Sequence, residues 1–198
     1  MTDTETLFNQ HIALHMECIG EAAVTAAPLV HSAAECMVDS LLNEGQMLVC
    51  GNGKVNAFAQ YFCSCMLGCH ENDRPALPAV NIGADPATLA ALSMASRPQE
   101  AFSRQIQALG REGDTLLLMT DDGNKSAMVQ ALQAAHDRQV RVIAITGRRE
   151  TDIHSLLHGD DIEIALPDVS PGRAAELIVI LLNALCSQVE AMLFGETD

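Results

Sequence analysis

The chain has 198 residues, with 26 acidic and 11 basic side chains and a formal net charge of −15. This length suits one α/β domain, in which folding buries roughly two-thirds of the surface of the unfolded chain. The acidic balance without a Lys/Arg run excludes direct binding to nucleic acid phosphates or to an anionic membrane, because both require clustered cations. A hydrophobic fraction of 48% excludes a disordered acidic chain.

The first residues lack the basic stretch and apolar core of a signal peptide, so we expect a cytoplasmic protein. Seven cysteines, an odd number in apolar surroundings, indicate free thiols in a reducing compartment. The longest apolar run, 177–182, is far shorter than the roughly 20 residues that span a bilayer, so no membrane span is expected.

The N-terminal segment, residues 1–44, predicts two helices that serve in oligomerisation. It is rich in Ala, with apolar side chains at helical spacing, and Pro28 breaks the pattern. Helices are therefore expected over 4–27 and 31–43, and Gly45 ends the second one.

In the remainder of the chain, residues 45–198, short apolar runs alternate with helical patterns. This alternation predicts a parallel sheet covered on both faces. We expect a single domain over 1–198, an α/β three-layer sandwich with a five-stranded, flavodoxin-like parallel sheet and a long C-terminal helix. The expected strands are 47–50, 79–82, 115–119, 140–145 and 162–166, and the expected helices are 56–67, 86–95, 99–109, 125–138 and 170–194.

The last helix begins at Ser170 and Pro171, an N-cap followed by proline in the first turn. Its segment 177–185 is apolar on every face, whereas a surface helix has one apolar stripe. One small core covers only part of such a helix, so a second subunit is expected to cover the rest, which predicts a homo-oligomer.

Two glycine-bearing loops, 50–56 and 119–126, each follow a strand and open a helix, where ligands bind in open parallel sheets. Their backbone N–H groups suit a phosphate, but Asp121 and Asp122 bring like charge to it. These carboxylates either cap the next helix or exclude phosphate, and neither role makes a phosphate site. The predicted ligand pocket, intact or vestigial, consists of Asn52, Gly53, Lys54, Val55, Thr120, Asp121, Asp122, Gly123, Asn124 and Lys125.

Both lysines of the chain, Lys54 and Lys125, fall in these two loops. We predict that one of them pairs with Asp121 or Asp122. An internal ion pair would then occupy the place of a bound phosphate.

Several segments in order carry a family resemblance: Cys50-Gly-Asn-Gly53, Arg74-Pro-Ala-Leu-Pro-Ala79, Leu109-Gly-Arg-Glu-Gly-Asp114, Gly123-Asn124 and Ile145-Thr-Gly147. With the order of elements, they make nearly the whole chain similar to the SIS-domain phosphosugar isomerase family. Within it, the chain resembles the branch of the phosphoheptose isomerases and the DnaA initiator-associating protein. The resemblance implies a tetramer.

The chain departs from this family at the residues that the chemistry requires. The His and Glu that the isomerase branch carries four residues apart fall at Tyr61 and Cys65, and the working Gln and His of its last helix fall at Ala175 and Asn183. These residues offer no base at neutral pH, and only Cys65 ligates a metal well. We therefore expect no catalytic residue, no metal and no cofactor, unless a shifted pKa makes Tyr61 or Cys65 an acid or base.

Resemblance and departures together predict a non-catalytic, multivalent homo-oligomer that binds the replication initiator DnaA and regulates chromosome replication. Leu193 and Phe194, near the C-terminus, are either the anchor for this partner or a contact to a neighbouring subunit. The alternatives are a phosphoheptose (sedoheptulose 7-phosphate) isomerase, for which Thr120 and Gly123-Asn124 are retained, and a carbohydrate-derivative-binding protein.

Four ligand-type side chains follow one another closely: Cys63, Cys65, Cys69 and His70. Only Cys65 and Cys69 share a helical face, and no second cysteine pair follows at zinc-finger spacing. Buried thiols are the preferred interpretation over a metal site.

Two histidine pairs, His11 with His15 and His154 with His158, have a spacing of four residues. This spacing suits one edge of a metal site or a pH-sensitive interface. Solvated helix faces are the preferred interpretation of both pairs.

Overall fold

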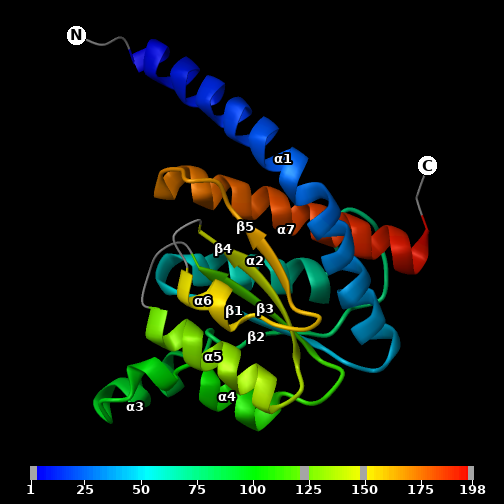
Figure 1. Ribbon diagram of the computed structural model, residues 1–198. Coiled ribbons are helices and arrows are strands. Elements are labelled where there is room, and N and C mark those ends of the chain that lie inside the picture. Colours follow the sequence, from blue (N-terminus) through cyan, green and yellow to red (C-terminus); the bar gives the residue numbers. More distant parts are fainter. Residues whose placement is uncertain (1–3, 121–124, 148–150, 196–198) are drawn as a thin grey trace.

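The computed structural model describes residues 4–120, 125–147 and 151–195. Its centre is a five-stranded parallel sheet with helices on both faces (Figure 1). The order across the sheet is β2-β1-β3-β4-β5, the flavodoxin-like order, which reverses between β1 and β3. The predicted α/β sandwich is thus confirmed. The strands are β1 (Met47–Gly51), β2 (Ala79–Asn81), β3 (Thr115–Thr120), β4 (Arg141–Thr146) and β5 (Ile162–Ala165).

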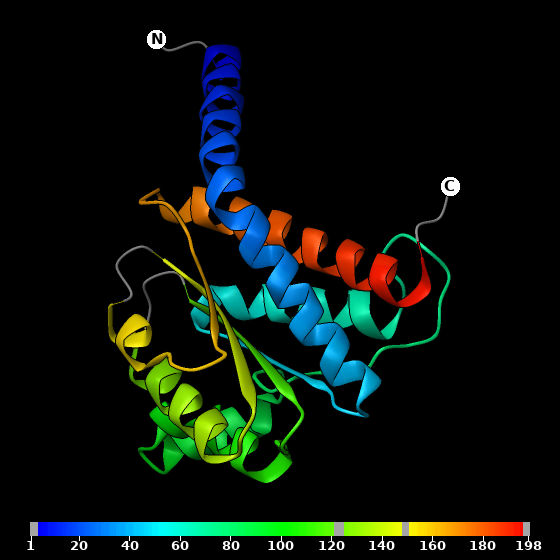
Figure 2. The ribbon, with the colours of Figure 1, turned by 45° about the vertical axis from the view of Figure 1, so that its right-hand side comes forward.

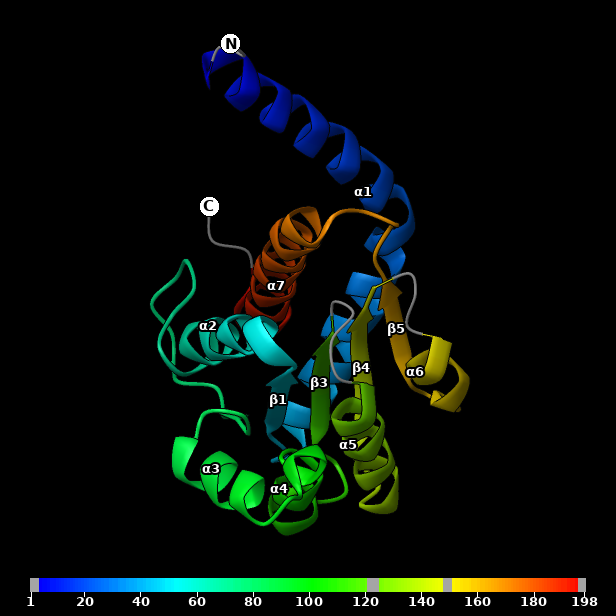
Figure 3. The same cartoon turned by 90° about the vertical axis from the view of Figure 1, so that its left-hand side faces the viewer.

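Two helical layers cover the sheet, because alternate strand residues point to opposite faces. Met47 and Val49 belong to the core under α1 (Thr4–Leu42), α2 (Asn56–Leu67) and α7 (Pro171–Phe194). Leu48 and Cys50 belong to the core under α4 (Ser103–Leu109), α5 (Lys125–Asp137) and α6 (Thr151–Leu156). Figure 3 shows the sheet between these layers. The remaining helices are α3 (Pro86–Met94) and the 3-10 helices η1 (Gly53–Val55) and η2 (Pro98–Glu100).

The predicted pair of N-terminal helices, 4–27 and 31–43, is wrong, because α1 is one helix from Thr4 to Leu42 with Pro28 inside it. Proline has no amide hydrogen for the carbonyl of Val24, four residues earlier. Val24 is 81% exposed, so water can satisfy that carbonyl. The helix continues with the change of direction seen partway along it in Figure 2, and its first half projects beyond the body.

The other boundaries differ from expectation by little. The five strands and the helices over 56–67, 125–138 and 170–194 are confirmed to within a residue or two. The helix expected over 99–109 begins later, at Ser103, because η2 takes the chain through Pro98–Glu100. The six-residue α6 was not predicted, since so short a segment shows no helical period.

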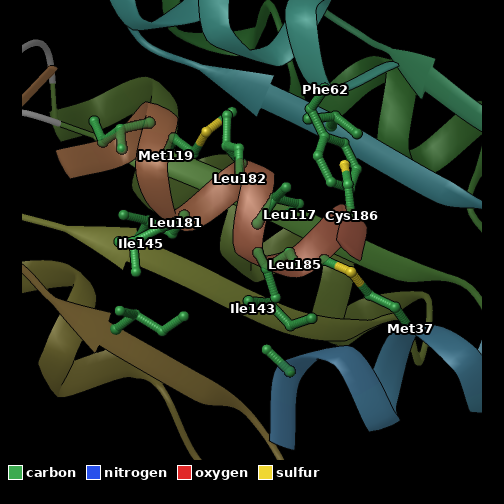
Figure 4. Packing of buried hydrophobic residues seen from close by; sticks show 14 of the residues in the cluster. Met37, Phe62, Leu117, Met119, Ile143, Ile145, Leu181, Leu182, Leu185 and Cys186 are labelled. Atoms are coloured by element: carbon green, nitrogen blue, oxygen red, sulfur yellow. The ribbon is translucent and has the colours of Figure 1, made fainter. Parts of the chain in front are cut away.

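The long helix α7 lies in the middle of the larger core. By length and composition alone its 24 residues are long and apolar enough to cross a membrane. In the fold, however, Leu177, Ile178, Leu181, Leu182 and Leu185 are all buried, and Figure 4 shows Leu181, Leu182 and Leu185 facing the sheet. Packing inside the domain therefore accounts for most of its apolar surface. The second subunit inferred from this helix stays a prediction.

Candidate functional site

The carboxyl ends of β1 and β3 lie side by side where the strand order reverses. Gly51 pairs with Met119, and the backbone N–H of Asn52 donates to the carbonyl of Met119 at 3.3 Å. Parallel α/β sheets bind ligands at such a switch point. Asn52 and Thr120, at the ends of the two strands, are therefore brought to the place where a ligand is expected.

The loop after β1 folds tightly over the end of its strand. A Cβ at Gly51 would lie 2.8 Å from the carbonyl carbon of Val55, and Gly53 has a left-handed φ of +52°. The Asn56 side chain donates to the carbonyl of Gly83 at 3.0 Å, which ties this loop to the segment after β2. The glycines predicted for a ligand loop are thus required by the backbone itself.

Polar atoms without hydrogen-bond partners gather at this point. Asn52 is 5% exposed and Thr120 is fully buried. Within the described part of the chain, neither the amide atoms of Asn52 nor the hydroxyl of Thr120 has a partner. Leaving such a group buried and unpaired costs about 1–3 kcal/mol. A ligand or an ordered water that hydrogen-bonds to both side chains would remove this cost.

The other predicted pocket residues divide into three groups. Lys54 is exposed on η1, whereas Val55 is buried in the larger core and presents nothing to a ligand. The side chain of Lys125, at the start of α5, and the residues Asp121, Asp122, Gly123 and Asn124 lie outside what the structure describes. The predicted Lys–Asp pair therefore stays a prediction.

Three of the four replaced isomerase positions meet between α2 and α7. The Tyr61 hydroxyl donates to Oδ1 of Asn183 at 2.6 Å, and Cys65 lies one helical turn after Tyr61. Ala175 stands two turns before Asn183 and brings only a methyl group. With Tyr61 and Asn183 bonded to each other and no donor atom at Ala175, these four positions do not form a metal site.

Proton transfer at these positions is not supported either. Burial raises the pKa of the Tyr61 phenol, and its contact with the Cys65 thiol adds to the rise, while the Asn183 hydrogen bond only partly opposes them. The phenol is therefore protonated at neutral pH, and an amide does not titrate. Among the described residues at the four positions there is no carboxylate or imidazole to act as a base.

A buried ion pair supports the same region, and no local sequence pattern predicts it. Arg74 Nε lies 2.6 Å from Glu190 Oε1, with the two side chains 2% and 4% exposed. Arg74 also donates to the carbonyls of Cys65 at 2.6 Å and Met66 at 2.9 Å. Arg74 belongs to one of the segments that carry the family resemblance, whereas no local pattern in the sequence marks Glu190 as its partner.

Three of the four histidines in these pairs are exposed, as expected, and His15 is half-buried, but their rings also contact other side chains. His11 Nε2 lies 2.8 Å from Glu176 Oε1, and His15 faces the same carboxylate. These contacts join α1 to α7.

The two histidines of the second pair, His154 and His158, contact different residues. His154 Nδ1 lies 2.5 Å from Glu163, and this hydrogen bond raises the pKa of His154. The His158 ring instead stacks on His136, with ring centroids 4.0 Å apart.

A parallel sheet in this order is typical of α/β proteins whose ligands bind at the switch point, where this chain has unpaired polar groups. Residues 11–147 match the SIS domain family, and the chain belongs to that family. The chain is 40% identical to the phosphoheptose isomerase of Chromohalobacter salexigens over 177 residues. These aligned residues cover 89% of this chain and 90% of that protein. The chain is 41% identical over 166 residues to the phosphoheptose isomerase of Laribacter hongkongensis, covering 84% and 85%.

Solved structures give the same result. The phosphoheptose isomerase of Neisseria gonorrhoeae superposes with a TM-score of 0.88 at 32% identity, covering 96% of this chain and 100% of that one. The phosphoheptose isomerase of Francisella tularensis superposes with a TM-score of 0.89 at 32% identity, covering 95% and 98%. The predicted family is therefore confirmed.

Proposed function

We propose that the protein binds a phosphorylated sugar at the ends of β1 and β3 without isomerising it. The observation that carries this proposal is that the buried amide of Asn52 and the buried hydroxyl of Thr120, at the ends of the neighbouring strands β1 and β3, both lack partners among the described residues. Sugar hydroxyls and phosphate oxygens are matched ligands for an amide and a hydroxyl. The relatives named phosphoheptose isomerases favour this ligand class over a purely structural role.

The absence of turnover follows from the replaced positions. Aldose/ketose isomerisation needs a base that removes the proton beside the carbonyl. The Tyr61 phenol is protonated and donates to Asn183, and Ala175 has no titratable group. The protein is thus proposed as a sugar-derivative-binding member of the family.

Thermal denaturation with sedoheptulose 7-phosphate, followed by NMR analysis of the sugar, tests both parts. A ligand at 100 times its dissociation constant adds about 2.7 kcal/mol of apparent stability. Asn52→Ala is expected to abolish the shift, while Asn43→Ala, a distant amide at the end of α1, keeps it. No shift at saturating sugar would refute the binding site, and product formation would make the protein an isomerase.

A second candidate function is binding of a protein partner, the replication initiator DnaA. Phe194 is 48% exposed at the end of α7, whereas Leu193 packs against the larger core. Of the two predicted anchor residues, Phe194 is the one available to a partner. Several copies in one oligomer would add weak single contacts together, and the seven free thiols suit the cytoplasm in which DnaA acts.

Retention of DnaA from the same organism on immobilised protein tests this candidate. Phe194→Ala is expected to release DnaA. Met94→Ala, which removes a side chain 89% exposed on α3, serves as the matched control and is expected to retain it. Equal retention by both variants would remove Phe194 from the interface.

A further inference from the structure

Three metal-ligating side chains from separate parts of the chain meet beside the contact of α2 with α7. They are the thiols of Cys65 on α2 and Cys186 on α7 and the imidazole of His70 in the loop after α2. One ligand atom of each lies within 4.8 Å of the other two. In a tetrahedral zinc site, Zn–S bonds of about 2.3 Å and Zn–N bonds of about 2.0–2.1 Å place ligand atoms roughly 3.5–3.8 Å apart. The three ligand atoms therefore need to move closer together by at most about 1.3 Å to match such a site.

We propose that Cys65, His70 and Cys186 bind one Zn²⁺ ion. The donor set of two thiolates and one imidazole is selective for zinc over the oxygen-seeking Mg²⁺ and Ca²⁺. Three protein ligands leave one tetrahedral position open for water or another ligand. The site shares only Cys65 with the four replaced isomerase positions, since neither His70 nor Cys186 is among them.

The backbone around these ligands is held by the buried Arg74–Glu190 pair. Arg74 donates to the carbonyl of Cys65 at 2.6 Å, and Glu190 accepts from the backbone N–H of His70 at 3.2 Å. Glu190 itself stands one helical turn after Cys186 on α7. One ion pair thus fixes the backbone at or beside all three ligands, which reduces the reorganisation needed on binding.

Binding requires the loss of two thiol protons, so the protein releases two protons as Zn²⁺ replaces them. Affinity therefore rises with pH. Cys65 and Cys186 are buried while His70 is half-buried, so the ion enters from the side of the imidazole.

The structure also separates these ligands from neighbouring thiols. Cys63 is buried in the core and Cys69 is exposed beyond the end of α2, and neither is close enough to join the group. Cys63 and Cys69 are therefore matched control thiols, because they lie close in sequence to the proposed ligands Cys65 and His70.

Titration of the reduced, chelator-treated full chain with Co²⁺, a spectroscopic substitute for Zn²⁺, tests the site. We expect one ion per chain, with a sulfur-to-cobalt charge-transfer band and the visible absorption of tetrahedral cobalt. Cys65→Ser, His70→Gln and Cys186→Ser should each weaken binding by more than about 100-fold, beyond the effect of losing a supporting hydrogen bond. Cys63→Ser and Cys69→Ser should leave both bands unchanged.

Two results would overturn the proposal: no binding by the reduced wild-type chain, or equal binding by His70→Gln and Cys186→Ser. A Cys65–Cys186 disulfide that persists in a glutathione buffer at the redox potential of the cytosol would also overturn it, because oxidised cysteines cannot bind the ion. Mass spectrometry detects such a disulfide. Circular dichroism of the metal-free variants checks folding. The half-buried His70→Gln keeps the test decisive if a buried cysteine variant does not fold. Sugar binding at β1 and β3 is unaffected by either result, because those residues are different.

Discussion

Two buried threonines of the same strand differ in whether their hydroxyls are paired. Thr115 is bonded to Ser40 at 2.7 Å, while Thr120 has no partner in the described chain; both are fully buried. Replacing Thr120 by the isosteric Val removes an unpaired hydroxyl. We expect Thr120→Val to raise the free energy of unfolding of the sugar-free protein by about 1 kcal/mol and to weaken sugar binding.

Thr115→Val is the matched control, because it breaks a hydrogen bond at the other end of β3. It is expected to lower the free energy of unfolding by about 1 kcal/mol. Urea denaturation of both variants, with and without sugar, gives the comparison. A loss of stability in Thr120→Val would mean that its hydroxyl is already satisfied in the free protein.

The buried Arg74–Glu190 pair gives a second prediction for individual residues. Glu190→Gln leaves the Arg74 charge buried, and removing one partner of such a pair costs about 3–5 kcal/mol. We expect about 3 kcal/mol, because glutamine keeps one oxygen and Arg74 keeps its bonds to the carbonyls of Cys65 and Met66. The exposed pair of Arg97 with Glu100 is the control, and Glu100→Gln should leave the unfolding midpoint unchanged.

This pair also makes stability depend on pH. Burial alone would raise the pKa of Glu190, but the hydrogen bonds from Arg74 and the His70 amide, together with the Arg74 charge, lower it overall. A lowered folded-state pKa adds stability that is fully present above the unfolded pKa and is lost as the pH falls through the folded value. The stability difference between wild type and Glu190→Gln should therefore narrow in acid. A constant difference would contradict the assigned direction.

At the scale of elements, Pro28 sets the course of α1. Proline inside a helix costs about 3 kcal/mol, although it also restricts the unfolded chain by about 1 kcal/mol. Pro28→Ala should thus raise the free energy of unfolding by roughly 2 kcal/mol. Pro98→Ala is the control, because Pro98 opens η2, where a missing N–H is harmless, so only a small loss is expected. Destabilisation by Pro28→Ala in urea would show that packing on α7 requires the bend.

Most elements could be predicted because their signals are local. The strands are short apolar runs between turns, and the Gly-Asn-Gly segment marks the loop that carries Asn52. The site beside α2 could not be predicted in this way, since His70 and its support Glu190 are 120 residues apart in sequence. The packing of α7 against α2 brings Cys186 close to Cys65. The proposed ligand set therefore includes this distant thiol and excludes Cys63 and Cys69, which are near Cys65 in the sequence.

The whole molecule leaves one apolar stripe partly uncovered. Positions 8, 12, 19 and 26 share a face of α1. Ala26 is buried and Ile19 half-buried, but Ile12 is 40% and Phe8 64% exposed, where the helix projects beyond the body (Figure 2). Within the described residues nothing covers this end of the stripe. A second copy of the chain is the occupant that we predict, and the family resemblance implies a tetramer.

Sedimentation velocity tests this assembly. Burying Phe8 and Ile12 contributes about 1–2 kcal/mol for each side chain, so a two-fold interface with four of them gains roughly 4–8 kcal/mol. The double variant Phe8→Ser with Ile12→Ser should therefore weaken association at least about a thousandfold and sediment as a smaller species. Met94→Ser, which removes an even more exposed side chain from α3, should keep the wild-type size. A monomeric wild type, or a double variant of unchanged size, would show that this stripe is not an interface.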